Sequence, residues 1–241
     1  MKPIIEARDL SLILSGKEVF RVEDFRLNKG EVMALVGPNG AGKSSLLRTL
    51  ALLERPTGGS LLIDGDEAYR NGNIRSIRRK MAIVFQEALL LDTTVRRNVT
   101  IALRIRGIVG QEASIRTDKW LERFGVSHLA RQSARHLSGG EAQRASLARA
   151  FAVEPEILFL DEPFSALDYP TRKALLGEMG SLLKEMNMAT LFVTHDYTEI
   201  PYLTSRVCVL FNGRIIKRGP VNEVFGEELF QKHCMVPWET L

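Results

Sequence analysis

Eight consecutive residues near the start of the sequence have the types and spacing needed to hold phosphate. They run Gly37-Pro38-Asn39-Gly40-Ala41-Gly42-Lys43-Ser44 and match the pattern GxxxxGK[ST], between an apolar, strand-like run at 31–37 and a helical run at 44–53. The glycines let successive backbone N–H groups turn toward one anion, and the start of a helix adds the positive end of its dipole. The spacing therefore predicts a loop that binds the phosphates of a nucleotide.

Side chains of this loop, together with two carboxylates further along the chain, fit phosphoryl transfer. Lys43 would place a positive charge between the β and γ phosphates, the Ser44 hydroxyl would ligate Mg²⁺, and Ser45 would add a hydrogen bond to phosphate. Asp161 ends a buried, strand-like run and would hold Mg²⁺ through its water shell. Glu162 follows it and suits the orientation or deprotonation of an attacking water; the alternative is a pair of solvated acids after a strand.

The elements that must position these residues follow an α/β pattern. Segments typical of strands and of helices alternate, which predicts a mostly parallel sheet covered by helices. The first thirty residues differ, because turn residues at 15–17 and 28–30 predict a small antiparallel β layer of short strands. Asn212-Gly213 predicts a hairpin near the end. Further strands are expected at 31–37, 81–85, 157–161 and 190–194.

The middle of the chain is expected to be helical. Residues 92–153 carry no convincing strand pattern, and helical patterns lie at 98–106, 112–124 and 140–153. We therefore expect one domain over residues 1–241, with a helical subdomain at about 88–153 inserted in it. The length fits this expectation, because a domain takes roughly 150 residues and single α/β domains are often larger.

Composition and charge exclude several classes of protein. Hydrophobic residues are 45% and charged residues 26%, which excludes a disordered, collagen-like or coiled-coil chain. The net charge of +4 is by itself too small for a nucleic-acid footprint, although a pI near 9.2 leaves anionic partners open. No apolar stretch approaches the roughly 18 residues of a membrane span. Cys208 and Cys234 suit a reducing compartment, have no metal-like spacing and are expected to be ordinary thiols. These features place the chain in the cytosol, so that a membrane role needs a partner.

Leu137-Ser138-Gly139-Gly140-Glu141 precedes the strand that ends at Asp161 and resembles the signature motif of ATP-binding cassette (ABC) proteins. The resemblance covers about residues 4–225 and includes, in the family's order, the following motifs. They are the Walker A loop (37–44), a Q-loop glutamine (Gln86), the signature (137–141), the Walker B strand with Asp161 and Glu162, a D-loop (165–168) and a switch histidine (His195). By this resemblance the chain is a P-loop ATPase that uses ATP and Mg²⁺.

The family implies a head-to-tail dimer in which two ATP molecules lie between the Walker A loop of one copy and the signature of the other. Ser138, Gly139 and Gly140 open a helix and would aim a hydroxyl and backbone amides at an anion; alternatively, they are only a serine cap with glycines. By the resemblance, Gln86 would contact Mg²⁺ or the attacking water. His195 would hydrogen-bond the γ phosphate, and Asp168 would reach the partner's P-loop.

Two positions depart from the family's pattern. Leu14 stands where an aromatic ring usually stacks on adenine, so that only apolar contact with the base is expected there, and Phe20 is a weaker candidate for the missing ring. Glu141 stands where glutamine is commoner. It places an acid near a helix start that should receive phosphate, and we expect reduced nucleotide affinity without loss of function.

The sequences around these motifs resemble those of the ATPase subunits of binding-protein-dependent importers, especially the importers for tungstate and molybdate. The resemblance then implies permease subunits, a homodimer, an extracytoplasmic solute-binding protein, no nucleic acid, and a place on the cytoplasmic face of the membrane. The apolar run 88–91 is either subdomain core or part of a groove that receives a permease helix. Alternatives are an exporter ATPase, a soluble ABC ATPase acting on nucleic acid or ribosomes, and a catalytically dead regulatory module.

Overall fold

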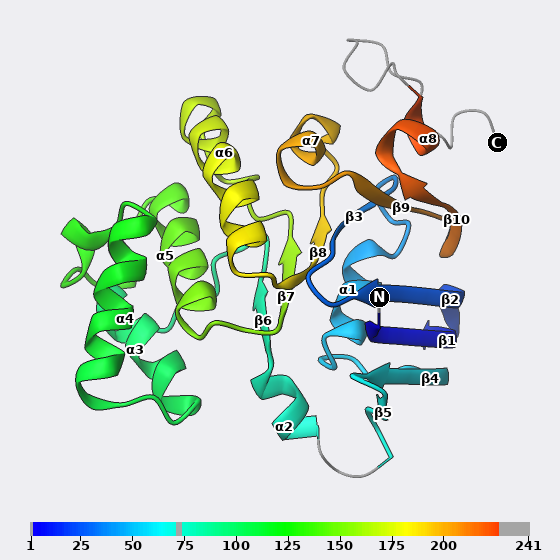
Figure 1. The fold of residues 1–241 in the computed structure, drawn as a ribbon, viewed down its shortest axis with the longest axis horizontal. Coiled ribbons are helices and arrows are strands. Elements are labelled where there is room, and N and C mark those ends of the chain that lie inside the picture. The colour runs from blue at the N-terminus through cyan, green and yellow to red at the C-terminus, as the bar shows by residue number, and fades with distance from the viewer. Residues whose placement is uncertain (1, 71–73, 227–241) are drawn as a thin grey trace. The chain divides into compact units, whose positions relative to one another are not determined.

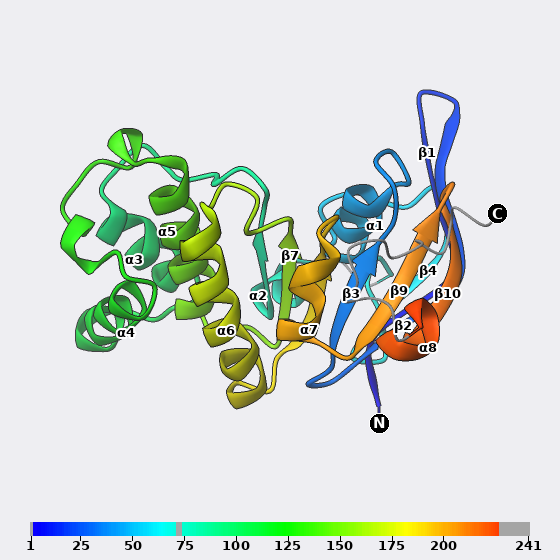
Figure 2. The ribbon, with the colours of Figure 1, turned by 90° about the horizontal axis from the view of Figure 1, so that it is seen from above.

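The computed structural model describes residues 2–70 and 74–226, and Cys234 lies outside them. The chain divides into two compact units, one with the described residues up to Arg78 and those from Leu175 onward, the other Arg79–Ala174. The α/β fold class is confirmed (Figures 1 and 2). The single domain over 1–241 with its subdomain at about 88–153 stays a prediction. In the described part of the chain, no helix is long and apolar enough to cross a membrane.

The first unit contains the antiparallel β layer. Its strands are β1 (Pro3–Leu14), β2 (Lys17–Asn28), β4 (Gly58–Ile63) and β5 (Asp66–Glu67), in the spatial order β2-β1-β4-β5. β1 and β2 are 12 residues each, so the expectation of short strands was wrong. Ser15 and Gly16 turn the chain between them with positive φ angles of 50° and 79°, as a tight hairpin requires.

The same unit holds the strands that carry the phosphate loop. β3 (Val32–Val36) pairs in parallel with β8 (Ala189–Val193) and with β9 (Arg206–Phe211), and β9 pairs antiparallel with β10 (Arg214–Pro220). The predicted hairpin is confirmed, because Asn212 and Gly213 have φ angles of 47° and 74°. The helices of this part are α1 (Lys43–Leu50), α7 (Ile200–Leu203) and α8 (Val221–Phe225).

The second unit is mostly helical. β6 (Met81–Val84) pairs in parallel with β7 (Ile157–Asp161), and the helices are α3 (Val95–Ile105), α4 (Gly110–Arg123) and α5 (Gly139–Ala152). The three helices pack on one another around Trp120, Phe124 and Phe151, whose ring centroids lie 5.3–6.1 Å apart. Each ring is 3% exposed or less, so the aromatic cluster is the centre of this unit's core. The sequence boundaries of the units, after Arg78 and after Ala174, fall within two helices, α2 (Ile74–Arg79) and α6 (Tyr169–Glu185).

Candidate nucleotide site

The predicted phosphate loop follows β3 and leads into α1, in the first unit. A Cβ atom on Gly37 would lie 2.0 Å from the carbonyl oxygen of Leu210 in β9, and the φ of Gly37 is 154°. Gly40 and Gly42 have φ angles of 81° and 97°. Because these values belong to the region that other residues avoid, the glycines of the motif are required by the backbone path itself.

The β9–β10 turn supports the loop from one side. The N–H of Gly213 donates to the carbonyl of Ala41 (3.2 Å), and the N–H of Arg21 donates to the carbonyl of Gly213 (2.8 Å). A Cβ on Gly213 would lie 2.7 Å from the carbonyl oxygen of Val19. The turn thus fits closely between the phosphate loop and β2, and any larger residue at Gly213 would meet the backbone of Val19 and Phe20 in β2.

Lys43 folds back over the phosphate loop. Its side chain is 6% exposed, and the ammonium group donates to the carbonyls of Gly37 (2.9 Å) and Pro38 (3.0 Å). Ser44 and Ser45 are half-buried in the first turn of α1, whereas Asn39 and Gly40 are exposed. The loop therefore gathers a buried cation and two hydroxyl-bearing residues at the start of a helix, which is an arrangement suited to phosphate.

Asp161 and Glu162 end β7 in the second unit. Asp161 is 4% exposed. Glu162 has a φ of 48°, and its carbonyl accepts from both the N–H (3.3 Å) and the hydroxyl (3.0 Å) of Ser165. A left-handed backbone at a residue other than glycine costs about 1–3 kcal/mol, and such strain gathers at functional positions. Seven other described residues besides glycine also have a positive φ, so this backbone does not by itself assign a role to Glu162, and its catalytic role stays a prediction.

Ser138 caps α5 through a reciprocal contact with Glu141. The Ser138 hydroxyl and N–H both donate to the Glu141 carboxylate at 2.8 Å, and the Glu141 N–H donates back to the hydroxyl at 3.4 Å. The N–H and then the hydroxyl of Ser138 lower the pKa of Glu141, so that this carboxyl stays ionised at neutral pH. Ser138, which is predicted to face phosphate, thus already donates its hydroxyl to a carboxylate of its own chain. Ser138 and Gly139 are nevertheless exposed to solvent.

Replacing Glu141 by glutamine is expected to tighten ATP-driven dimerisation by about twofold to fivefold. The amide oxygen still accepts from Ser138 and keeps the cap, while the negative charge beside the incoming phosphate disappears. Light scattering at rising ATP concentration, with hydrolysis suppressed by chelating Mg²⁺, measures the midpoint. A midpoint that stays fixed or rises would show that the charge of Glu141 does not oppose the nucleotide.

Gln86 and His195 are both exposed, Gln86 just after β6 in the second unit and His195 after β8 in the first. Thr194, buried before the histidine, donates its hydroxyl to Glu199 at 2.6 Å and accepts from the N–H of Asp196 at 3.0 Å. These contacts fix the turn that carries His195. Sequence analysis did not single out Thr194 or Glu199; polar residues directly after an apolar strand were the signal.

Leu14 lies at the end of β1 and is 43% exposed, so that its side chain is available to a base. Phe20 is fully buried in the core of the first unit. The interpretation of Phe20 as an adenine-stacking ring was wrong, because a base cannot reach a ring that the protein covers.

Replacing Leu14 by tryptophan is expected to raise ATP affinity about twofold to tenfold, because a ring at this position would stack on adenine. The new indole also reports binding by its fluorescence during a titration with ATP. Ile13→Trp is the matched control, since Ile13 is a neighbour with 41% exposure. Equal affinity in the Leu14→Trp variant and the wild type would count against the adenine placement.

Asp168 caps α6, with its carboxylate accepting from the N–H of Thr171 at 3.1 Å. This N–H, and then the Thr171 hydroxyl, lower the pKa of Asp168, so that the residue is a charged group at the surface. Its predicted reach toward a partner's P-loop stays a prediction. The predicted residues of the first unit are Leu14, 37–45 and His195. Those of the second unit are Gln86, 138–140, Asp161, Glu162 and Asp168.

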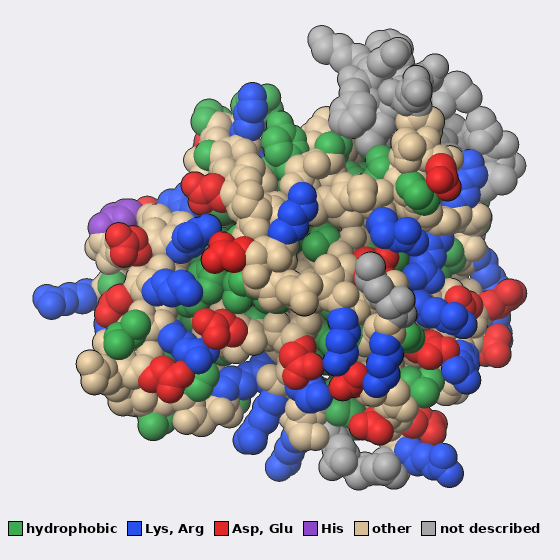
Figure 3. Space-filling view, in the orientation of Figure 1, with side chains coloured by type: hydrophobic (Ala, Val, Ile, Leu, Met, Phe, Trp, Pro, Cys, Tyr) green, Lys and Arg blue, Asp and Glu red, His purple; other side chains and the backbone are tan. Residues whose placement is uncertain are grey.

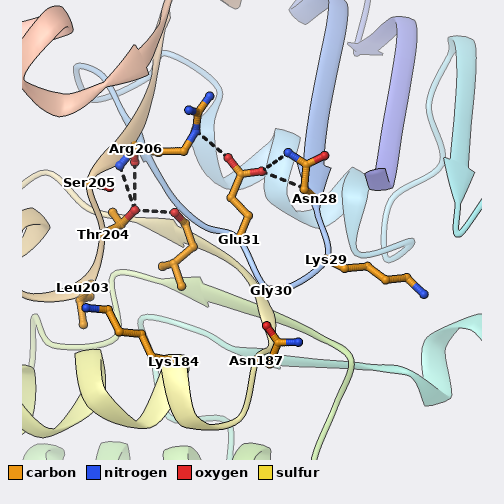
Figure 4. A pocket seen from close by; sticks show the side chains of 11 residues that line it. Asn28, Lys29, Gly30, Glu31, Lys184, Asn187, Leu203, Thr204, Ser205 and Arg206 are labelled. Carbon is orange, nitrogen blue, oxygen red and sulfur yellow. Dashed lines mark hydrogen bonds and ion pairs between the residues drawn. The ribbon is translucent and has the colours of Figure 1, made fainter. Parts of the chain in front are cut away.

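A pocket of about 580 Å³ opens in the first unit at the amino ends of β3 and β9, and no predicted site residue lines it (Figure 4). Glu31 lines this pocket, and its side chain is 7% exposed. Its carboxylate accepts from the backbone N–H (2.9 Å) and the side-chain amide (2.7 Å) of Asn28, and it forms an ion pair with Arg206 at 2.8 Å. Since the phosphate loop follows the carboxyl end of β3, this pocket lies at the other end of the strand. It is therefore distinct from the nucleotide site.

Charged side chains of both signs are interspersed over the face shown in Figure 3.

Cys208, the cysteine within the described residues, is fully buried, and burial raises the pKa of its thiol to about 12. A thiol held in this protonated state is unreactive, so that Cys208 acts as a small apolar core residue.

Comparisons with known proteins identify the family to which the chain is similar. The family described as ABC transporter matches residues 21–165. Phosphate import ATP-binding protein PstB 2 of Natronomonas pharaonis is 36% identical over 223 residues, which cover 88% of this chain and 78% of that protein. Molybdate/tungstate import ATP-binding protein WtpC of Thermococcus kodakarensis is 39% identical over 202 residues, covering 83% and 60%. Methionine import ATP-binding protein MetN of Xanthomonas campestris is 38% identical over 221 residues, covering 89% and 66%.

A solved structure has the same fold. CbiO1 from Clostridium perfringens, described as part of the ABC transporter complex cbiONQ, superposes with a TM-score of 0.84 at 29% identity, and the match covers 95% of this chain and 93% of that one. The family match spans more than half of the sequence and contains the phosphate loop, the signature and both carboxylates. The chain therefore belongs to the ABC transporter family, as one of its ATP-binding ATPase subunits.

Proposed function

We propose that this chain is the ATP-hydrolysing subunit of a membrane importer for a small oxyanion, tungstate or molybdate, and that two copies close head-to-tail around two ATP molecules. One observation carries the dimer: a chain with its own phosphate loop also presents a second anion-binding helix end, with Ser138 and Gly139 exposed at the start of α5. A second copy supplies the phosphate that this helix end would bind.

The roles of the site residues follow from their chemistry. Lys43 holds the β and γ phosphates, and Glu162 takes the proton of the attacking water. His195 and Gln86 orient that water, His195 from a fixed turn after β8 and Gln86 from an exposed position after β6. Asp168 contacts the phosphate loop of the second copy.

The donor set at the phosphates fits Mg²⁺. Ser44, Gln86 and Asp161 offer oxygen atoms, and no group of three or more His, Cys, Asp or Glu residues stands together in the described part of the chain. A hard cation held by a few protein oxygens, substrate phosphates and water is the usual pattern for Mg²⁺ in phosphoryl transfer. When bound, the ion would neutralise charge on the β and γ phosphates.

The run Ala88–Leu91, here called the docking run, is the proposed contact for a permease helix. Leu89 is 56% exposed and Leu91 is 49% exposed, so they are not packed as subdomain core. Exposed leucines near Gln86 place an apolar surface close to a residue expected to contact Mg²⁺ or the attacking water. Closure of the dimer around ATP would then move the permease, and hydrolysis would reopen it. A solute-binding protein would reach the complex through the permease, from outside the membrane.

The proposed cargo rests on the relatives. The relatives for molybdate or tungstate and for phosphate import oxyanions, whereas the methionine relative does not, and the three identities of 36–39% are similar. The chain spans 60% and 66% of the length of two of these relatives. Uptake of molybdate, tungstate, phosphate and methionine by proteoliposomes that contain the chain and a permease that copurifies with it separates the cargoes. Outward movement of cargo would contradict import.

Complementation between two inactive variants tests the dimer. Lys43→Ala removes the phosphate contact of the loop, and Ser138→Asp keeps a helix cap while it repels phosphate at the signature. In a head-to-tail dimer, a mixed pair has one doubly damaged site and one intact site. An equal mixture should therefore regain about a quarter of wild-type turnover if sites are independent. A mixture no more active than the mean of the two variants would overturn the proposal.

A further inference from the structure

The docking run belongs to a segment, 85–91, that connects β6 to α3 without regular secondary structure. It carries exposed side chains, yet its backbone is held. Three polar side chains from α5 and α3, which are Gln143, Arg149 and Asn98, bind its carbonyl groups from within the second unit. Polar side chains of this size are rarely buried unless the structure needs their hydrogen bonds.

Gln143 holds the start of the segment. Its side chain is 1% exposed, and its amide nitrogen donates to the carbonyl of Phe85 at 3.0 Å. The Oε1 atom of the same amide is buried and has no hydrogen-bond partner in the part of the chain that the structure describes. The residue thus leaves an acceptor unsatisfied while it keeps one donor on the backbone beside Gln86.

Arg149, which lies nearer the carboxyl end of α5, binds the backbone in the middle of the segment. Its guanidinium donates to the carbonyl of Leu89 at 2.7 Å and to the hydroxyl of Ser146 at 3.3 Å. Burial lowers the pKa of Arg149 from its usual value. The backbone of Leu89 is therefore fixed to α5, although the Leu89 side chain points into solvent with 56% exposure.

Asn98 of α3 holds the end of the segment. It is 1% exposed; its Oδ1 accepts from the N–H of Leu91 at 2.8 Å, and its amide donates to the carbonyls of Leu91 and Thr94, both at 3.1 Å. The segment is consequently held at Phe85, Leu89 and Leu91, so it behaves as a strap on the helices rather than as a free loop.

We propose that Gln143 and Arg149 are positioning residues that fasten the segment 85–91, which contains the docking run, to α5, so that a displacement of this segment carries the signature at the start of α5 with it. This inference rests on the proposed function. α5 is a continuous helix of 14 residues from the Ser138 cap, and both contacts are made to backbone carbonyls. The connection therefore does not depend on the side chains that meet the permease, and it passes through one rigid element.

The experiment compares ATP turnover of the isolated chain with that of its complex with the permease. The ratio of the two is the permease stimulation. In Gln143→Leu and Arg149→Met, turnover of the isolated chain should stay within about twofold of the wild type. The stimulation should fall about threefold to thirtyfold, the usual range for a lost coupling contact. Gln143→Leu removes the orphan acceptor together with the donor to the Phe85 carbonyl, so thermal unfolding is measured to show that the variant remains folded.

Two further variants separate positioning from a general structural effect. Arg149→Lys keeps one donor within reach of the Leu89 carbonyl and should recover part of the stimulation. Arg116→Met is the control, since Arg116 is an α4 residue that pairs with Glu112 (2.8 Å) and Glu154 (3.0 Å) and does not contact the strap. Hydrogen–deuterium exchange should become faster in residues 85–91 of Arg149→Met and not in those of the control.

The outcomes are distinct. If Gln143→Leu and Arg149→Met are stimulated like the wild type, or if Arg116→Met loses as much stimulation as they do, the inference is overturned. If the wild-type chain binds no permease or shows no stimulation, the proposed function fails instead. Loss of stimulation in both variants, with partial recovery in Arg149→Lys, supports the inference.

Discussion

Replacing Glu162 by glutamine is expected to lower ATP turnover by about 10² to 10⁴-fold, because the amide cannot accept the proton of the attacking water. Glutamine has the same size and leaves the left-handed backbone at this position, with its φ of 48°, as it is. ATP binding should therefore persist, and the variant should accumulate as an ATP-bound dimer. Turnover is measured by phosphate release, and the dimer is measured by light scattering with Mg²⁺ and ATP.

A matched control for this variant is Glu156→Gln. Glu156 is exposed in the same unit, and its carboxylate lies 3.7 Å from the ammonium group of Lys80. It precedes the first residue of β7, whereas Glu162 follows the last one. Its replacement should leave turnover close to that of the wild type. Hydrolysis at the normal rate in Glu162→Gln would show that another group is the base, even if the dimer forms.

Replacing Lys43 by alanine is expected to weaken ATP binding by about tenfold to a hundredfold, since hydrogen bonds to charged groups contribute about 1.5–3 kcal/mol each. The ammonium is buried and donates to Gly37 and Pro38 in the loop, so it is already placed at the loop's centre. Calorimetric titration with ATP measures the change. Adenosine, which lacks phosphate, should not discriminate between the variant and the wild type.

Lys184→Ala is the control for the loss of a cation. Lys184 is an exposed lysine in the lining of the pocket at the amino ends of β3 and β9, in the same unit. Thermal unfolding should show that both variants remain folded. An ATP affinity of Lys43→Ala within twofold of the wild type would remove this lysine from the phosphate site.

Much of the fold was readable from the sequence because strong local patterns coincide with the elements. The strands expected at 81–85, 157–161 and 190–194 match β6, β7 and β8 to within one residue. The helices expected at 98–106 and 112–124 begin two or three residues earlier in the structure. The Thr94 side chain caps α3 through the N–H of Arg97, and a cap extends a helix beyond its apolar pattern.

Other elements were not anticipated, for identifiable reasons. β4 is a short strand, and its partner β1 lies far from it in the sequence, so the local pattern does not reveal the pairing; the Asp64-Gly65 turn would have indicated the hairpin of β4 with β5. The buried spacing of Leu175, Met179 and Leu182 would have indicated α6. The strap contacts could not be predicted, because nothing in the local pattern indicates that Gln143 is buried.

The site was predicted at the level of motifs, since each motif requires its residue types in order. Two features of the site were not predicted from the motifs. The hydroxyl of Ser138 donates to Glu141 of the same chain, and Phe20 is buried, so that a base cannot contact its ring. The contact at Ser138 could have been read from the sequence, because Ser138 and Glu141 have the S-x-x-E spacing of a capping box; the burial of Phe20 depends on three-dimensional packing, which its residue type does not fix.

The close fit of the Asn212-Gly213 turn decides where this protein can be tagged. That turn is bonded to Ala41 and Arg21, so an inserted epitope there would disturb the phosphate loop. The Asp64-Gly65 turn looks the same in sequence, but a Cβ on Gly65 would meet nothing within 4 Å. Asp64 is itself bonded to Ile4 and pairs with Lys29, so a fluorescent label or purification tag is better placed after Gly65, where it leaves the contacts of the phosphate loop undisturbed.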